Sequence, residues 1–498
     1  MRKVLIIGSG VAGLTAGILL QKAGYETHIF EKNTMPGGLC TGWKREQYWI
    51  DGCLHWFTGA KKGSKLNELW KEVGALGDGI EMREKESFFS AELGGACVTF
   101  WRELEKTRKE LLKLSPEDRV EINKMINLTK KAQCMIVPVD KPLDKMGIRD
   151  YIEMSIAMKE MPQVLKEYEK QNMQDFAKRF KHPAIRQALL AYMDPKYPAY
   201  SFICSYATVS SGDGDLPAGG SFGVTQRMAR KYQKLGGILH TNCKVKKVML
   251  KQKVAIGIVL ENGKTFSGDE VICASDPMAV FPQLLDDRYM PKKLRRAYKK
   301  PQDYHVNSAV YVAFAVKTSA EIPKETRIIS CKPIKVGKQN HNQMILNNYS
   351  YEAEFAPEGK TIIQVSFHQN KEDATYWINL RENQEEYKKI KKQLANEVLS
   401  RMIERYPTIK DDIRVIDCWT PATFNRYCGA YQGAYMGFVH DKKVKKVSVT
   451  GKAAKLKNTY LASQWMMNPG GIPIAAAQGK YAAWRIIHKK GVSMNSSK

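Results

Sequence analysis

The chain has 498 residues, and its 79 lysine and arginine residues outnumber the 51 aspartate and glutamate residues, so the formal net charge is +28. Hydrophobic residues make up 43% of the sequence and aromatic residues 10%, which excludes a disordered chain and indicates a large core in two or three domains. The cysteines are scattered, with no pair at zinc-binding spacing. They exclude a disulfide scaffold, and we expect reduced thiols, a cytoplasmic protein and no metal site.

The first 31 residues combine short apolar runs with a glycine-rich turn. Residues 3–7 predict a buried parallel strand, residues 14–23 a helix, and residues 25–30 a second strand that ends at Glu31. The basic start and the apolar stretch after it imitate a signal peptide. We reject that interpretation because glycines interrupt the stretch and no typical cleavage site follows it.

The turn has the spacing of the dinucleotide-binding fingerprint, with glycines at Gly8, Gly10 and Gly13. The first glycine permits a tight turn, the second lets the backbone approach a pyrophosphate, and the third lets helix and strand pack closely. Free N–H groups at the start of the helix suit phosphates, and Glu31 can accept hydrogen bonds from ribose hydroxyls. We therefore expect a bound nucleotide; the alternative is a glycine-rich turn without a ligand.

The next part of the chain lacks such a turn. Charged or apolar helices are expected at residues 101–113 and 176–193, so we interpret residues 76–204 as a substrate or cap domain that is mainly helical. Three methionines repeat at helical spacing, at Met154, Met158 and Met161. Methionine adapts to irregular apolar ligands, but an ordinary position in a helix core is the better explanation for any one of them.

Glycine turns and strands then return. A turn at residues 217–220 precedes a helix at about 222–234. Short strands are expected at 238–241, 245–250, 255–260 and 271–275. This pattern indicates that the nucleotide-binding domain resumes after an insertion.

A second mixed segment follows, and the chain closes with another glycine turn. Strands are predicted at 308–316 and 361–367, and a long charged helix at 385–405. The last elements are a strand at 458–462, a turn at 469–471 and a helix at 474–488.

Several motifs together resemble one family. The glycine fingerprint with Glu31 and Lys32, the second glycine pair Gly37-Gly38, and Asp51-Gly52-x-x-His55 are similar to the N-terminal region of the FAD-dependent amine oxidase and phytoene desaturase superfamily. In that superfamily the second glycine pair lies along the FAD. A nicotinamide dehydrogenase needs only the first fingerprint.

Two later motifs support the same resemblance. The turn at residues 217–220 and the strand that begins at Val245 are similar to the middle motif, whose strand passes the adenine side of FAD. Residues 460–483 resemble the closing motif, which faces the flavin ring, and this stretch includes Gln464, Gly471, Ile472 and Pro473. The superfamily often carries an acid where this chain has Gln464.

Residues 420–437 look most like the branch of carotenoid isomerases and retinol saturases. The resemblance implies an α/β fold, with a Rossmann-type FAD-binding domain, an interleaved α+β substrate domain and a helical cap. The FAD-binding domain would comprise residues 1–75, 205–285 and 416–498. The substrate domain would comprise residues 76–204 and 286–415.

The resemblance also implies the chemistry. We expect FAD as the tightly held cofactor. No second glycine fingerprint indicates NAD(P), and the electron donor or acceptor is unknown. The expected reaction is hydride exchange between flavin N5 and a carbon–carbon double bond of an apolar polyene, retinoid-like or unsaturated lipid. The candidates for proton transfer are His55, Tyr427, Tyr431 and Tyr435. A packed histidine, and tyrosines that only line an apolar tunnel, are the structural alternatives.

An amine oxidase is the alternative function, with an aromatic cage supplied by the region from Tyr431 to Tyr435. The basic clusters at residues 292–300 and 442–457 fit an anionic membrane surface and a peripheral membrane protein, although a solvated lysine-rich face explains them as well. We expect no nucleic-acid partner because no zinc finger, ribonucleoprotein aromatic motif or recognition helix is visible.

Overall fold

The computed structural model describes residues 1–489. Three distant parts of the chain contribute strands to one five-stranded parallel sheet. In spatial order its strands are β21 (Thr459–Leu461), β13 (Glu270–Cys273), β1 (Lys3–Ile7), β2 (Glu26–Phe30) and β9 (Ile238–His240). All five were predicted from short apolar runs, and the parallel order brings their C-terminal ends to one edge.

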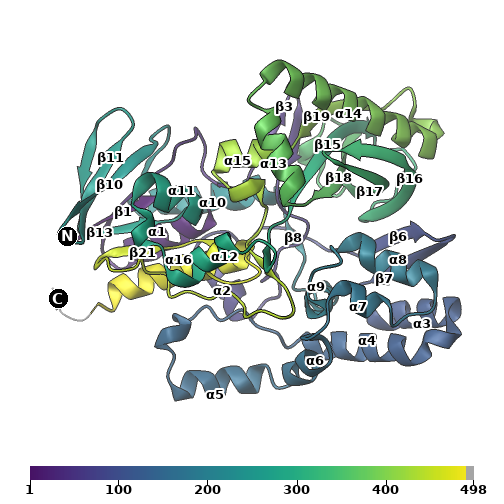
Figure 1. Cartoon of the computed structure of the whole chain (residues 1–498), viewed down its shortest axis with the longest axis horizontal. Helices are drawn as coiled ribbons and strands as arrows, with labels where there is room; N and C mark the ends of the chain where they lie inside the picture. Colours follow the sequence, from purple (N-terminus) through teal and green to yellow (C-terminus); the bar gives the residue numbers. More distant parts are fainter. Residues whose placement is uncertain (490–498) are drawn as a thin grey trace.

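Helices α1 (Val11–Lys22), α10 (Gly220–Lys234) and α16 (Ile472–Ile487) pack beside this sheet (Figure 1). α1 contacts both of the others. Glycines make the closest approaches possible: a Cβ at Gly479 would lie 2.3 Å from the carbonyl oxygen of Ala12. The sheet's other side contacts an antiparallel sheet formed by β10 (Val245–Lys251), β11 (Val254–Leu260) and β12 (Thr265–Ser267).

A second, seven-stranded sheet builds the other half of the molecule (Figure 1). Its order is β19 (Arg414–Trp419), β15 (Ser308–Lys317), β18 (Lys360–Gln369), β17 (Gln339–Asn348), β16 (Arg327–Val336), β6 (Ser87–Leu93) and β7 (Ala96–Trp101). The β16–β6 pair is parallel and the other pairs are antiparallel. Helices α13 (Lys371–Leu380) and α14 (Gln384–Arg405) pack against this sheet.

The remaining helices are mostly short. A lobe below the second sheet contains α3 (Leu104–Leu114), α4 (Arg119–Ala132), α5 (Ile148–Ala157), α6 (Met161–Tyr168), α7 (Met173–Ala177), α8 (Pro183–Tyr192) and α9 (Ala199–Ser210). Elsewhere lie α2 (Lys65–Glu72), α11 (Pro277–Ala279), α12 (Lys292–Lys299) and α15 (Pro421–Cys428). Three small ribbons pair β3 (Gly42–Arg45) with β4 (Tyr48–Asp51), β5 (Met82–Arg83) with β8 (Leu216–Pro217), and β14 (Tyr304–His305) with β20 (Val439–His440).

The structure corrects several details of the sequence analysis. The expected helix at 101–113 begins only at Leu104, because Trp101 ends strand β7. The expected helix at 176–193 is two helices, and Pro183 begins the second. The stretch interpreted as mainly helical does consist largely of helices, but it also contains strands β6 and β7. The division after residue 415 falls inside β19, which pairs with β15 of the second sheet.

The methionine-rich stretch is less buried than expected. Met161 is buried, but α5, which carries Met154, has no buried residue. The interpretation of all three methionines as helix-core residues is therefore wrong for Met154. Within residues 1–489, no helix combines the length and the apolar character that crossing a membrane requires.

Candidate active site

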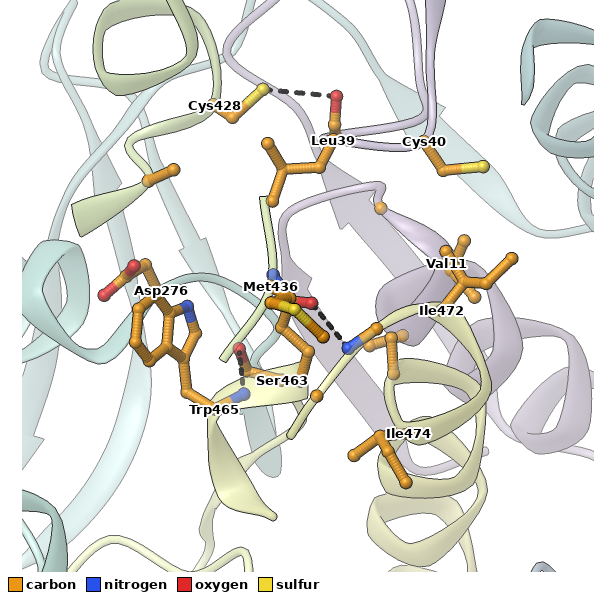
Figure 2. A pocket seen from close by; sticks show the side chains of 18 of the residues that line it. Val11, Leu39, Cys40, Asp276, Cys428, Met436, Ser463, Trp465, Ile472 and Ile474 are labelled. Carbon is orange, nitrogen blue, oxygen red and sulfur yellow. Dashed lines mark hydrogen bonds between the residues drawn. The ribbon is translucent and has the colours of Figure 1, made fainter. Parts of the chain in front are cut away.

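A cavity of about 860 Å³ begins at the C-terminal edge of the parallel sheet and continues to the helical lobe. Its walls come from residues 7–12, 30–40, 53–58, 135–138, 200–208, 243–245, 274–284, 425–436, 446 and 462–475. Figure 2 shows part of it, with Leu39, Met436 and Ile472 around the same space. All site residues predicted from the sequence line this cavity except Gly13.

Gly13 does not line the cavity but lies behind the residues that do. A Cβ at this position would lie 2.0 Å from the carbonyl oxygen of Gly8 and 3.2 Å from the Cβ of Ala274. The residue therefore has to be glycine for α1 to begin so close to β1 and β13. That close packing sets the direction of the free N–H groups at the start of α1.

The two glycine pairs lie against each other. Gly10 and Gly37 form a bridge between the two turns, and the Gly37 N–H donates to the carbonyl oxygen of Ser9 at 3.0 Å. Gly38 has φ +62°, and a Cβ there would lie 3.2 Å from the Cα of Gly10. Side chains at these positions would occupy the space through which an extended phosphate chain has to pass.

Glu31 is buried at the end of β2, and two neighbours fix its carboxylate. The backbone N–H and the hydroxyl of Ser9 donate to Oε2 at 3.0 and 2.7 Å. The backbone N–H and the side-chain amide of Asn33 donate to Oε1, both at 3.0 Å. A carboxylate has about four acceptor sites, so these four hydrogen bonds fix its orientation, and a ribose hydroxyl would have to displace or share one of them.

The C-terminal end of α15 closes the Glu31 end of the cavity. Lys32 Nζ donates to the carbonyl oxygen of Arg426 at 3.0 Å, and the amide of Asn33 donates to that of Tyr427 at 3.1 Å. Burial lowers the pKa of Lys32. Tyr427 therefore lies beside the Glu31 carboxylate, and burial raises its pKa.

At the opposite end, Gln464 holds the closing glycine turn. Its Oε1 accepts a hydrogen bond from the backbone N–H of Gly471 at 2.9 Å. Gly471 has φ +84° and precedes α16, which starts with Ile472 and Pro473. The positive end of the α16 dipole thus meets the cavity, where it stabilises nearby negative charge. An amide supplies the same acceptor that an acid would supply here.

Asp276 is a cavity residue that the sequence analysis missed. Its carboxylate accepts hydrogen bonds from the N–H of Met278 and the N–H of Tyr431, both at 2.8 Å, and from the Tyr298 hydroxyl at 3.2 Å. Burial raises the pKa of Asp276 to about 6. Figure 2 shows it beside the ring of Trp465. The sequence gave no indication that Asp276, an acid after a strand, would be buried, because the groups that bury it come from distant segments.

Tyr431 and Tyr435 occupy different surroundings. Tyr431 contacts Tyr298 edge to face, with ring centroids 5.1 Å apart, and lies 6.3 Å from Trp465 by the same measure. Tyr435 lies near Tyr197, whose hydroxyl donates to the sulfur of Met436 at 3.2 Å, and burial raises the pKa of Tyr435 well above the ordinary value. The two rings thus pack against different neighbours, although both line the cavity.

His55 lines the cavity where β4 leads into α2. Burial, with smaller contributions from the nearby basic groups Lys85 and His368, lowers the pKa of His55 to about 4. Its carbonyl oxygen accepts a hydrogen bond from Lys85 Nζ at 3.0 Å, and burial lowers the pKa of Lys85 to about 8. The imidazole is thus neutral at neutral pH, so it can donate an N–H but brings no positive charge.

Comparison with known proteins gives the family. The model of the flavin-containing amine oxidoreductases matches residues 11–487, which is nearly the whole chain. The chain belongs to this family. It is therefore a flavin-containing oxidoreductase, with FAD as its cofactor. The family and fold expected from the motifs are confirmed.

Individual relatives of this family member are distant. The chloroplastic prolycopene isomerase of Daucus carota is 21% identical over 99% of this chain and 81% of that protein. The all-trans-retinol 13,14-reductase of Danio rerio is 20% identical over 98% of this chain and 87% of that protein. Among solved structures, an oxidoreductase from Methanosarcina mazei has a TM-score of 0.61 at 17% identity, over 97% of this chain and 100% of that one.

The residues present fit FAD. Glycines leave the space between the Gly10 and Gly38 turns open, a buried carboxylate lies at the end of β2, and a helix N-terminus lies at the far end of the cavity. These are the groups that suit a pyrophosphate, a ribose and an electron-rich ring system, respectively.

Proposed function

We propose that this flavoenzyme acts on carbon–carbon double bonds of an apolar polyene, a retinoid-like molecule or another unsaturated lipid. One observation carries the proposal: beyond the glycine turns, the cavity continues between apolar side chains of distant segments. They include Leu39, Trp56, Met135, Ile136, Val137, Pro138 and Met436. An elongated hydrocarbon suits such walls because they offer dispersion contacts and leave few polar groups to desolvate.

We assign the cofactor's parts to residues in cavity order. Gly8, Gly10 and the Gly37-Gly38 pair would hold the pyrophosphate, Glu31 the ribose and Val245 the adenine. Gln464, Gly471, Ile472 and Pro473 would face the flavin. When bound, FAD supplies hydride exchange at N5, in the direction that its redox partner dictates.

The chain itself has to place the substrate, exclude water and move a proton. For proton transfer we propose Tyr431 or Tyr435, with His55 as a neutral donor, because each lines the cavity beyond the glycine turns. We assign Tyr427 to the ribose end instead, because its carbonyl oxygen is bonded to Asn33, the residue that also fixes Glu31. Burial keeps the phenol of Tyr435 protonated at neutral pH, since it raises the pKa of this side chain.

An amine oxidase is the second candidate, because the family includes amine oxidoreductases. The separate surroundings of Tyr431 and Tyr435 weigh against it, since an amine cage would bring aromatic rings to opposite sides of one nitrogen. Tyr431 instead packs its ring against Tyr298 and Trp465.

Product analysis separates the two functions. The purified protein, loaded with FAD, is incubated with a panel of polyenes, retinoids and unsaturated fatty acids, and separately with mono- and polyamines in air. We expect a lipid product that has gained or lost two hydrogens, or changed double-bond geometry, and no peroxide from any amine. Peroxide release with an amine, and unchanged alkenes, would assign the amine oxidase function instead.

A further inference from the structure

Helix α5 has an apolar side that nothing in the described part of the chain covers. It carries four of the most exposed large hydrophobic residues of residues 1–489: Ile148 is 81% exposed, Tyr151 46%, Ile152 53% and Ile156 67%. Their spacing of three and four residues places them on one side of the helix. Figure 1 shows α5 at the edge of the molecule, apart from the main body of the helical lobe.

The charges around α5 favour an anionic partner. Lys145, Arg149 and Lys159 are exposed, and none of them forms an ion pair within residues 1–489. The acids nearby are already paired: Asp144 with Arg485, Asp150 with Lys141 and Glu160 with Lys131. Glu153 interacts with the cation Lys65. Among these side chains, Lys145, Arg149, Lys159 and Glu153 form no ion pair within residues 1–489, so three cations and one acid are left unpaired on and beside the helix.

The basic surface continues from α5 to the C-terminal lysine cluster. Lys452 lies within electrostatic range of Arg485, Lys145 and Asp144, so this part of the lysine cluster lies near the segment that leads into α5. The same stretch contacts α12, because Lys293 Nζ donates to the carbonyl oxygen of Ser448 at 3.2 Å. The two basic clusters seen in the sequence are thus neighbours in the fold and extend to the apolar helix.

The helix is also joined to the wall of the cavity. Residues 133–147 connect α4 to α5, and residues 135–138 of that segment line the cavity. The Tyr481 hydroxyl of α16 donates to the carbonyl oxygen of Pro138 at 2.5 Å, which ties this segment to the FAD-binding half. A partner seated on α5 would therefore lie beside one end of the cavity.

We propose that α5 and the adjoining basic residues form a docking surface for an anionic phospholipid bilayer. The four apolar side chains enter the interface between headgroups and acyl chains, and Lys145, Arg149, Lys159 and Lys452 contact the headgroups. An exposed apolar helix side flanked by unpaired cations is the pattern of a helix that lies in the plane of a membrane surface. Such a surface binds reversibly, and salt weakens the electrostatic part.

The test is sedimentation of the full chain with vesicles, either of phosphatidylcholine alone or with 30% phosphatidylserine. We expect binding to the anionic vesicles at low salt, weakened by 500 mM NaCl. Ile152→Ser/Ile156→Ser should reduce binding by about tenfold or more, because it removes the apolar contribution. Lys145→Gln/Arg149→Gln should reduce it by about tenfold to thirtyfold, at about fivefold for each cation.

Val120→Ser is the matched control, because Val120 is 70% exposed on α4, away from α5. It should bind like the unaltered protein, and all variants should keep the same melting temperature because the altered side chains are exposed. The proposal is overturned if anionic vesicles do not bind the protein at low salt, or if the control loses as much binding as the isoleucine variant. It is also overturned if the isoleucine variant binds vesicles like the unaltered protein but has a lower mass by sedimentation in the absence of lipid. That result would assign the surface to a second copy of the chain. No substrate is needed, so failure here leaves the proposed reaction untouched.

Discussion

The side-chain oxygen of Gln464 accepts a hydrogen bond from the backbone N–H of Gly471 at 2.9 Å, and this bond fixes the turn that leads into α16. Six residues lie between the two partners, and one of them is Gly470, with φ +91°. The bond therefore holds together a turn that has little intrinsic rigidity of its own. The orientation of the α16 N-terminus toward the cavity depends on it.

Gln464→Leu should weaken FAD binding by about tenfold, which corresponds to the loss of one hydrogen bond of about 1 kcal/mol and some ordering of the turn. Gln464→Glu retains the acceptor, so it should hold FAD nearly as tightly. The added negative charge should lower the flavin reduction potential. Fluorescence titration of the apoprotein with FAD and a redox titration check these two results. Equal affinities for the leucine variant and the unaltered protein would contradict the role of the bond.

Gly38→Ala should lose most FAD binding. The residue has φ +62°, and its new Cβ would meet the Cα of Gly10 at 3.2 Å, between the two glycine turns. Gly24→Ala is the control, because Gly24 has φ +80° but no atom within 4 Å of its Cβ position. Flavin absorbance per mole of purified protein measures the outcome. The control variant introduces backbone strain but no steric clash. An equal loss of flavin in both variants would therefore show that backbone strain alone explains the effect, and that the close approach of the two turns does not.

Asp276 should make the stability depend on pH. Burial raises its pKa to about 6, above the value of roughly 3.9 of an unfolded chain. The stabilisation that goes with the protonated form is therefore complete below about pH 4 and is lost as the pH rises through about 6. The difference amounts to about 3 kcal/mol at most.

The measurement is the melting temperature of Asp276→Asn and of the unaltered protein, each at pH 4.5 and pH 8. The asparagine variant cannot ionise, so its melting temperature relative to the unaltered protein should rise between the two pH values. Comparing the change with pH, and not the absolute melting temperatures, removes the constant cost of replacing one carboxylate oxygen by an amide. An unchanged difference between pH 4.5 and pH 8 would show that Asp276 does not titrate in this range.

His55 should not produce the acid limb of a pH–rate profile near neutrality. Its pKa is lowered to about 4 by burial, with Lys85 and His368 adding to the effect, so the ring is already neutral at pH 5.5. The expected result is that His55→Gln lowers turnover by about tenfold or more if the N–H donates, while the shape of the profile between pH 5.5 and 8 stays the same. Loss of an acid limb near pH 6.5 in this variant would contradict the assignment.

Local spacing explains why much of the FAD-binding half could be predicted. The strand before Gly8 and the acid after β2 belong to one continuous unit of about thirty residues, and the structure places them on one edge of the parallel sheet. Strand β6 was missed although it forms a local hairpin with β7, and its place in the second sheet could not be recognised in this way. It pairs with β16, which lies more than two hundred residues further along the chain, so its partner leaves no trace in the local pattern.

Two site features depended on tertiary contacts in the same way. Asp276 becomes a buried acid only because Tyr298 and the backbone of Tyr431 reach it from other segments. Helix α5 has the periodicity of a helix that packs into a core, yet none of its residues is buried. Periodicity predicts which side of a helix is apolar, but it does not say whether protein or another partner covers that side.

The visible spectrum of the purified full chain under anaerobic conditions tests the central claim most directly. The flavin is first reduced by light, and a polyene, an unsaturated fatty acid or an amine is then added; the oxidised flavin is treated with the same compounds in parallel. We predict that an alkene reoxidises the reduced flavin, that a more saturated lipid bleaches the oxidised flavin, or that an alkene isomerises while the flavin stays reduced. A protein that binds no flavin, or a flavin that only amines bleach, would contradict the account.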